Sequence, residues 1–433
     1  MRKVSLAIHV VLASLFSQAL YSQVRSDTVL ASILRLNNDR VFTSVLDDAK
    51  TYRCQVIYTQ INRTKNNTPT FKNYYYNVDP DLYFNPASTV KMPLAFLALE
   101  KLNVMNVKKV NKYTAMQFDS NHVGQRVAVN DSTSANGLPS ILHYIKKAFL
   151  ISDNDAYNRL YQFVGQQAIN RNLHSKGYKA VRITRQFLGF TEEQNRHANG
   201  IRFIDKKGRL IYYQPPAYNT DSFNFSHSIK LGRAHVNSRD SIVNAPFDFT
   251  KHNNVSLEDY QQMLQSVLFP SSVAAGQRFA LTKDDKRFLL RYLSQYPSET
   301  KYPKYDTTKY YDSYVKFFFR DATQKMPDNI RVFNKVGWSY GFLTDISYIV
   351  DLENKIEFML AATLYVNSDE VLNDGKYDYD TIGYPFLYQL GQTMYKHELQ
   401  RQRAYKPKLT RFALKYEKRN PNDTRPSITD ADN

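Results

Sequence analysis

The tetrapeptide Ser88-Thr89-Val90-Lys91 combines two side chains that can perform nucleophilic chemistry. Residues three positions apart share a face of a helix, so the Ser88 hydroxyl and the Lys91 amine would lie side by side. A serine in a first helical turn lies near free backbone N–H groups, which favour negative charge on a reacting oxygen. A neutral amine beside it can accept the hydroxyl proton. The tetrapeptide therefore predicts a serine nucleophile with a lysine base.

The surroundings of this tetrapeptide distinguish it from two chance matches. The same Ser-x-x-Lys spacing occurs at residues 298–301 and 313–316, both in polar, tyrosine-bearing stretches. Ser88 instead follows Pro86 and opens an apolar run that predicts a long helix to about Leu102. A buried helix of this kind can hold the pair rigidly.

A second motif, Ser152-Asp153-Asn154, stands between helices predicted over residues 138–150 and 154–164. It offers a hydroxyl that can relay a proton and an amide that can bind a substrate carbonyl or amide. Serine and aspartate are also favoured at helix N-caps, so a purely structural role is the alternative.

A third motif, Lys335-Val336-Gly337, lies in a run that predicts a strand. A lysine projecting from a strand can hold a substrate carboxylate, and glycine lets a substrate approach the backbone closely. The alternative is a solvent-exposed lysine at a sheet edge.

Taken together in this chain order, the three motifs resemble those of the class A serine β-lactamases and the penicillin-binding proteins. The resemblance covers about residues 26–400. It implies an antiparallel sheet flanked by helices, with the site at their junction. The roles that it implies are an acylated nucleophile (Ser88), its proton acceptor (Lys91), a proton relay to the leaving nitrogen (Ser152), a ligand of the substrate amide (Asn154), a cation that assists the relay and attracts a carboxylate (Lys335), and substrate-binding backbone at Gly337 and Trp338, where the N–H groups of Ser88 and Trp338 form the oxyanion hole.

The sequence departs from this family in two places. The family has Thr or Ser where Val336 stands, and the loss of such a charge-assisted hydrogen bond costs about 1.5–3 kcal/mol. The family's deacylating glutamate lies in a Glu-x-x-Leu-Asn pattern, which residues 190–195 do not match. Glu192 or Glu193 is the candidate base, and a solvated acidic loop is the alternative. Without a base, an acyl-enzyme would persist.

The remaining patterns predict one layered domain. Its fold class is an α/β (α+β) sandwich, in which an antiparallel sheet from both chain ends is flanked by helices and a helical block. Residues 195–255 are polar and rich in turn formers, which indicates an insertion. The other predicted elements are helices over 28–36, 256–268, 282–293 and 384–400, and strands over 52–61, 70–76, 332–336, 343–350 and 356–365.

Composition excludes several classes. The 433 residues are 42% hydrophobic, which is enough for a large core and excludes wholesale disorder. The single cysteine, Cys54, lies in a strand-like run that favours a buried thiol, and it cannot form an internal disulfide or a Cys-rich zinc site. No metal or cofactor is predicted. The net charge of +18 is spread along the chain without a nucleic-acid-binding motif, so no nucleic-acid partner is predicted.

The two chain ends differ from the domain between them. Residues 1–22 combine Arg2 and Lys3 with a short apolar stretch and small residues, which predicts a cleaved signal peptide and no stable membrane span. The protein is therefore expected to be exported to the periplasm or secreted. Residues 401–433 predict a basic, polar tail that frays.

These observations favour an exported serine hydrolase that forms an acyl-enzyme on Ser88, with hydrolysis of a β-lactam or a related amide as its leading activity. A D-alanyl peptidase or esterase acting on cell-wall material is the second hypothesis. A catalytically inactive module that binds an envelope polymer is the third. The expected partner is thus a small-molecule or peptidoglycan-derived substrate, and the sequence does not indicate an oligomeric state.

Overall fold

The computed structural model describes residues 24–420 and 422–430. The predicted signal peptide, residues 1–22, lies outside the described residues. Within the described ranges, no helix is both long and apolar enough to cross a membrane.

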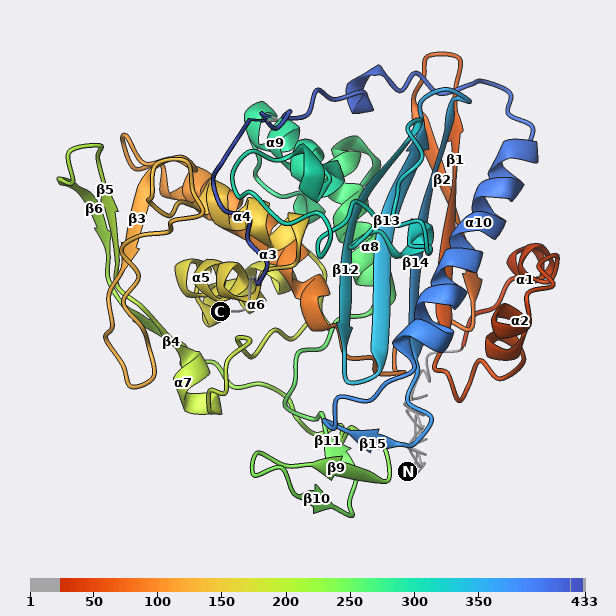
Figure 1. The fold of residues 1–433 in the computed structure, drawn as a ribbon, viewed down its shortest axis with the longest axis horizontal. Helices are drawn as coiled ribbons and strands as arrows, with labels where there is room; N and C mark the ends of the chain where they lie inside the picture. Colours follow the sequence, from red (N-terminus) through yellow and green to blue (C-terminus); the bar gives the residue numbers. More distant parts are fainter. Residues whose placement is uncertain (1–23, 421, 431–433) are drawn as a thin grey trace, which may run out of the picture.

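A five-stranded antiparallel sheet forms the centre of the molecule (Figure 1). It joins strands from both chain ends, as the sequence predicts, and the strand order is β12-β13-β14-β1-β2. Every residue of β13 is buried, because helices cover both faces of the sheet centre. Cys54 is fully buried directly before β1, as expected. The strands are β1 (Gln55–Arg63), β2 (Pro69–Tyr76), β12 (Ile330–Ser339), β13 (Phe342–Asp351) and β14 (Ile356–Tyr365).

Two hydrophobic cores lie on opposite faces of this sheet, because side chains alternate along each strand. On β12, Val332 and Val336 pack into one core, whereas Phe333 packs into the other. The core containing Val336 is covered by α1 (Thr28–Leu34), α2 (Arg40–Asp47) and α10 (Tyr384–Gln400). The opposite core is covered by α8 (Leu257–Leu268), α9 (Lys283–Ser294) and the helical block, which comprises α3 (Lys91–Met105), α4 (Ile141–Leu150), α5 (Asn154–Val164) and α6 (Gln166–Ser175).

Residues 195–255, predicted as an insertion, form short strands outside the central sheet (Figure 1). The part up to residue 218 lies beside the helical block, where two of its strands join β3 in a small sheet, and residues 230–248 lie at the end of the central sheet. Phe249 is fully buried there in a minor core with Tyr83 and Leu372. The elements are α7 (Glu192–Arg196), β3 (Ala115–Phe118), β4 (His197–Ala198), β5 (Ile201–Ile204), β6 (Leu210–Gln214), β7 (Ala217–Tyr218), β8 (Lys230–Leu231), β9 (Ala234–Val236), β10 (Ile242–Val243), β11 (Phe247–Asp248) and β15 (Val371–Leu372).

The segment after α10 does not fray, so that sequence prediction is wrong for the described part of the tail. Leu409 and Phe412 are buried in the hydrophobic core that lies between the central sheet and the helical block. The Phe412 ring lies 4.9 Å from that of Tyr348 on β13. Farther along, Ile428 exchanges backbone hydrogen bonds with the segment around Lys304. A few apolar side chains in a basic segment therefore hold it against the domain.

Candidate active site

Ser88 lies in a single 3-10 turn, Ala87–Val90, that leads directly into α3. Ala87 has a left-handed backbone conformation with φ of +43°, which turns the chain into the helix. All residues of α3 from Lys91 to Glu100 are buried, so the helix has no solvent-exposed stripe over this length. Ser88 is thus held at the mouth of a rigid, fully packed helix while its own side chain stays partly exposed.

Lys91 is fully buried and its amine lies among oxygen acceptors from two motifs. Its Nζ lies 2.7 Å from Ser88 Oγ, 2.8 Å from Asn154 Oδ1 and 3.3 Å from Ser152 Oγ. It also donates to the Ser152 carbonyl at 2.5 Å. The amine therefore links the nucleophile candidate to the Ser-Asp-Asn motif.

Ser152 joins α4 to α5 and carries a left-handed backbone conformation, with φ of +68°. Such a conformation is costly for a serine and is found where the surroundings impose it, often at functional sites. The next residue, Asp153, is the N-cap of α5 and accepts a hydrogen bond from Ala156 N at 2.7 Å. Asp153 thus has the N-cap role of the alternative interpretation, whereas the Ser152 hydroxyl lies beside the Lys91 amine.

The Lys335 side chain extends from β12 to the Ser152 hydroxyl. Its Nζ donates to Ser152 Oγ at 2.9 Å and to its neighbour's carbonyl, Val336 O, at 2.7 Å. The side chain is buried, so the alternative of a solvent-exposed edge lysine is wrong. Burial, and next the charge of Lys91, lower the pKa of the Lys335 amine well below that of an ordinary lysine.

Gly337 and Trp338 continue β12 past the nucleophile. A Cβ on Gly337 would lie 2.6 Å from Pro86 O and 2.9 Å from Ser88 N, so only glycine allows the strand to approach the turn this closely. Val336 points to the other face of the sheet and is fully buried. Its place is a packing position, which explains why an apolar side chain stands there.

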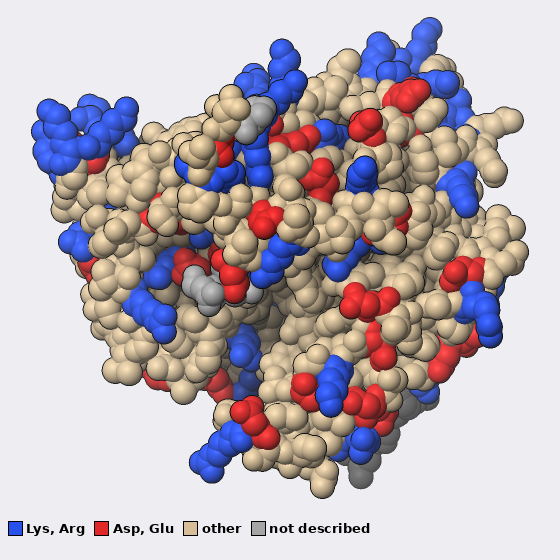
Figure 2. Space-filling model, viewed as in Figure 1, with Lys and Arg blue, Asp and Glu red and all other residues tan. Residues whose placement is uncertain are grey.

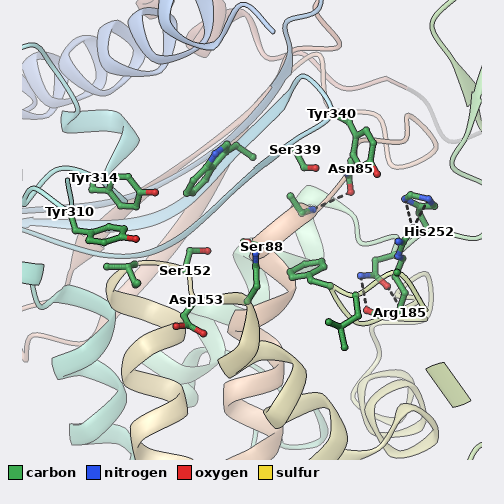
Figure 3. A pocket seen from close by; sticks show the side chains of 18 residues that line it. Asn85, Ser88, Ser152, Asp153, Arg185, His252, Tyr310, Tyr314, Ser339 and Tyr340 are labelled. Carbon is green, nitrogen blue, oxygen red and sulfur yellow. Dashed lines mark hydrogen bonds between the residues drawn. The ribbon is translucent and has the colours of Figure 1, made fainter. Parts of the chain in front are cut away.

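A cavity of about 500 Å³ separates the helical block from the edge strand β12 (Figure 3). The space-filling view shows a hollow in the same region between these two parts of the molecule (Figure 2). Its described lining residues come from six parts of the chain: Asn85, Ala87, Ser88, Ile151, Ser152, Asp153, Asn154, Arg185, Phe187, Leu188, Gly189, His252, Asn253, Tyr310, Tyr314, Trp338, Ser339 and Tyr340.

A comparison with known protein families identifies the family of the chain. A model of the β-lactamase enzyme family matches residues 40–397, which is most of the chain. The chain belongs to this β-lactamase family. The family supports a serine hydrolase of the β-lactamase type.

Solved structures similar to the chain include three β-lactamases at low identity. That from Sphaerobacter thermophilus is 14% identical, with 83% of this chain and 96% of that chain covered and a TM-score of 0.44. The class A enzyme from Mycobacterium abscessus is 12% identical, with 82% and 96% covered and a TM-score of 0.42. That from Streptomyces albus G is 13% identical, with 84% and 99% covered and a TM-score of 0.44. No curated protein matches the chain.

The two glutamates proposed as deacylation bases in this β-lactamase-family protein contact other partners. Glu192 forms an ion pair with Lys251, and the Glu193 carboxylate lies 3.1 Å from His197 Nε2. Neither glutamate lines the cavity. The preceding loop instead presents Phe187, whose ring centroid lies 4.9 Å from Lys91 Nζ.

Several cavity residues were not found by motif analysis. Arg185 and Phe187 come from the loop before α7, and His252 comes from the insertion. Tyr310 and Tyr314 line the end of the cavity near Ser152 (Figure 3). The tyrosine-rich run around residue 310 was the one available signal, since the others carry no pattern that distinguishes them from surface residues.

Proposed function

We propose that this β-lactamase-family protein acts by acyl transfer through Ser88, on a β-lactam or a related amide. The observation that carries the proposal is the convergence of three distant motifs on one hydroxyl. Ser88 Oγ, Lys91 Nζ and Ser152 Oγ form a connected chain of contacts, which Lys335 Nζ extends from the opposite wall.

In the acylation step, Ser88 Oγ bonds to the substrate carbonyl carbon and the carbon–nitrogen bond breaks. The hydroxyl proton passes to a neutral Lys91 amine and then through the Ser152 hydroxyl to the leaving nitrogen. The backbone N–H groups of Ser88 and Trp338 would stabilise the developing oxyanion. Lys335, when charged, orients Ser152 and attracts a carboxylate on the leaving part of the substrate.

Release of the acyl group by water is expected to be slow. Among the described residues that line the cavity, Asp153 is the only acidic one. It is already engaged by Ala156 N and lies 3.3 Å from Lys147 Nζ. Glu192 is paired elsewhere. This favours a long-lived acyl-enzyme and thus the second hypothesis, a penicillin-binding peptidase or esterase, over a rapid β-lactamase.

Labelling with a fluorescent penicillin tests the proposal. The wild-type protein is expected to become labelled, and Ser88→Ala is expected to remain unlabelled. Ser298→Ala is a matched control, because residues 298–301 repeat the Ser-x-x-Lys spacing outside the cavity, and it should label like wild type. Absence of a label on the wild type, or a label that survives Ser88→Ala, contradicts the proposal. Nitrocefin turnover then separates the two activities, since rapid turnover would favour the lactamase.

We also propose that residues 1–22 direct export and are then removed. N-terminal sequencing of the protein made in a bacterial cell should find a start near residue 23 in the exported fraction.

The third hypothesis, an inactive envelope-binding module, requires that the protein bind peptidoglycan, that this binding weaken as the salt concentration rises, and that Ser88→Ala leave it unchanged. A pull-down with peptidoglycan at several salt concentrations measures these effects.

A further inference from the structure

The cavity has two chemically different ends on either side of Ser88 (Figure 3). Ser152, Tyr310 and Tyr314 lie toward one end, and Arg185 with His252 lies toward the other. In the proposed function Ser152 protonates the leaving nitrogen, so the leaving part of the substrate must extend toward Ser152. The acyl part must then extend toward Arg185.

Arg185 brings a positive charge to this second end. Its guanidinium forms no ion pair among the described residues. The nearest polar partner is His252, whose Nε2 lies 2.7 Å from Arg185 Nη1. Its backbone is tied down as well, because Arg185 N donates to Asn253 Oδ1 at 3.1 Å. The charge is thus held in place at the cavity wall and is left available to an anion in the cavity.

His252 orients this guanidinium without neutralising it. Three aromatic rings surround the imidazole, with centroids 5.6 Å (Phe247), 5.0 Å (Phe249) and 6.1 Å (Tyr340) away. Burial and the charge of Arg185 lower the pKa of His252 to about 3, although the Asp248 carboxylate acts in the opposite direction. A neutral imidazole nitrogen accepts a hydrogen bond from Arg185, and no counter-charge is placed beside it.

We propose that Arg185, positioned by His252, binds a carboxylate on the acyl side of the substrate. The substrate class is then an acyl donor with two anionic groups, one on the leaving part near Lys335 and one on the acyl part near Arg185. The proposal rests on the proposed function for the direction in which the substrate lies. It also gives the 195–255 region a role, because that region supplies His252 and two of the rings around it.

Two penicillins that differ by a single acyl-side carboxylate test this assignment. Carbenicillin carries that carboxylate and benzylpenicillin lacks it. Trp338 is the chain's single tryptophan and lines the cavity, so its fluorescence can report reversible binding to Ser88→Ala. Carbenicillin is expected to bind about tenfold to a hundredfold more tightly than benzylpenicillin, the range for a hydrogen-bonded charge pair.

Adding Arg185→Gln to Ser88→Ala should abolish this preference while changing benzylpenicillin affinity less than about twofold. Arg185→Lys keeps the charge and should retain part of the preference. Lys251→Gln is the matched control: it removes a neighbouring cation that pairs with Glu192 outside the cavity, and the preference should remain.

Equal affinity of Ser88→Ala for the two penicillins, or no binding of either, overturns the assignment. This result needs no Arg185 variant, so it holds even if such a variant fails to fold. Mass spectrometry of the Ser88-bearing protein distinguishes this failure from failure of the proposed function. Acylation of Ser88 without the carbenicillin preference removes the Arg185 site alone. Selective binding without acylation supports the Arg185 site and removes the acyl-transfer proposal.

Discussion

Two buried amines approach the same serine hydroxyl at the candidate active site. Lys91 and Lys335 reach Ser152 Oγ from opposite walls, at 3.3 Å and 2.9 Å. Two charges so close oppose each other, and the pKa of Lys335 is lowered by burial and by the charge of Lys91. Removal of the proton from Lys91 removes this opposing charge, so a neutral Lys91 favours the charged Lys335 that the proposed acylation requires.

The lowered pKa of Lys335 makes acylation sensitive to alkaline pH. A group with a lowered pKa loses its proton at a lower pH than an ordinary lysine, and with it the charge that attracts a carboxylate. We expect the second-order rate of Ser88 acylation to fall as pH rises through this lowered pKa. Lys335→Arg, whose guanidinium stays charged, should react more slowly but lose that fall. Stopped-flow acylation by nitrocefin over the pH range in which the protein stays folded measures both, and an unchanged alkaline fall in the arginine variant would refute the assignment.

His252 is expected to make the fold labile to acid. Its pKa is about 3 in the folded protein, whereas an unfolded histidine titrates near 6.5. Between these values the unfolded chain binds a proton that the folded chain does not, so stability falls as the pH is lowered from about 6.5 toward 3. The slope for one group is at most about 1.4 kcal/mol per pH unit. Urea unfolding at several pH values should show a smaller slope for His252→Gln, and an identical slope would exclude this role.

At the scale of elements, the site depends on how closely β12 approaches the turn that bears Ser88. Gly337→Ala would place a methyl group 2.6 Å from Pro86 O and 2.9 Å from Ser88 N, so the strand and the turn must separate. We expect penicillin labelling to fall at least about a hundredfold, since small misplacements of reacting groups have effects of that size. Gly276→Ala is the control, because nothing lies within 4 Å of its added Cβ. Wild-type labelling of a folded Gly337→Ala would count against this packing.

The elements that bear apolar patterns were predictable, whereas contacts between distant segments were not. The helix that follows Ser88 and the three late strands were predicted because their buried runs are long, although β12 extends beyond its predicted residues 332–336 at both ends. The burial of Lys335 depends on the helical block packed against β12, and no local pattern encodes it. Arg185 and His252 meet across 67 positions, so only the folded chain places them together.

At the scale of the whole molecule, the tail closes one side of the domain. Phe412 is fully buried against the central sheet, so Phe412→Ala should lower the free energy of unfolding by about 3–5 kcal/mol. Penicillin labelling of the folded variant should be unchanged, because Phe412 does not line the cavity. Tyr405→Ala, at an exposed position of the same segment, should leave stability within about 0.5 kcal/mol of wild type. Denaturant unfolding gives both values, and equal stability of the two variants would show that the tail is not anchored.

Activation of the Ser88 hydroxyl requires that the fold bring residues 88, 152 and 335 to one cleft. Peptide mapping by mass spectrometry after incubation with benzylpenicillin tests this most directly. We expect one adduct with the full mass of the penicillin, on the tryptic peptide that contains Ser88, and no adduct in Ser88→Ala or Lys91→Ala. An adduct on any other peptide, or none on the folded wild-type protein, would contradict it.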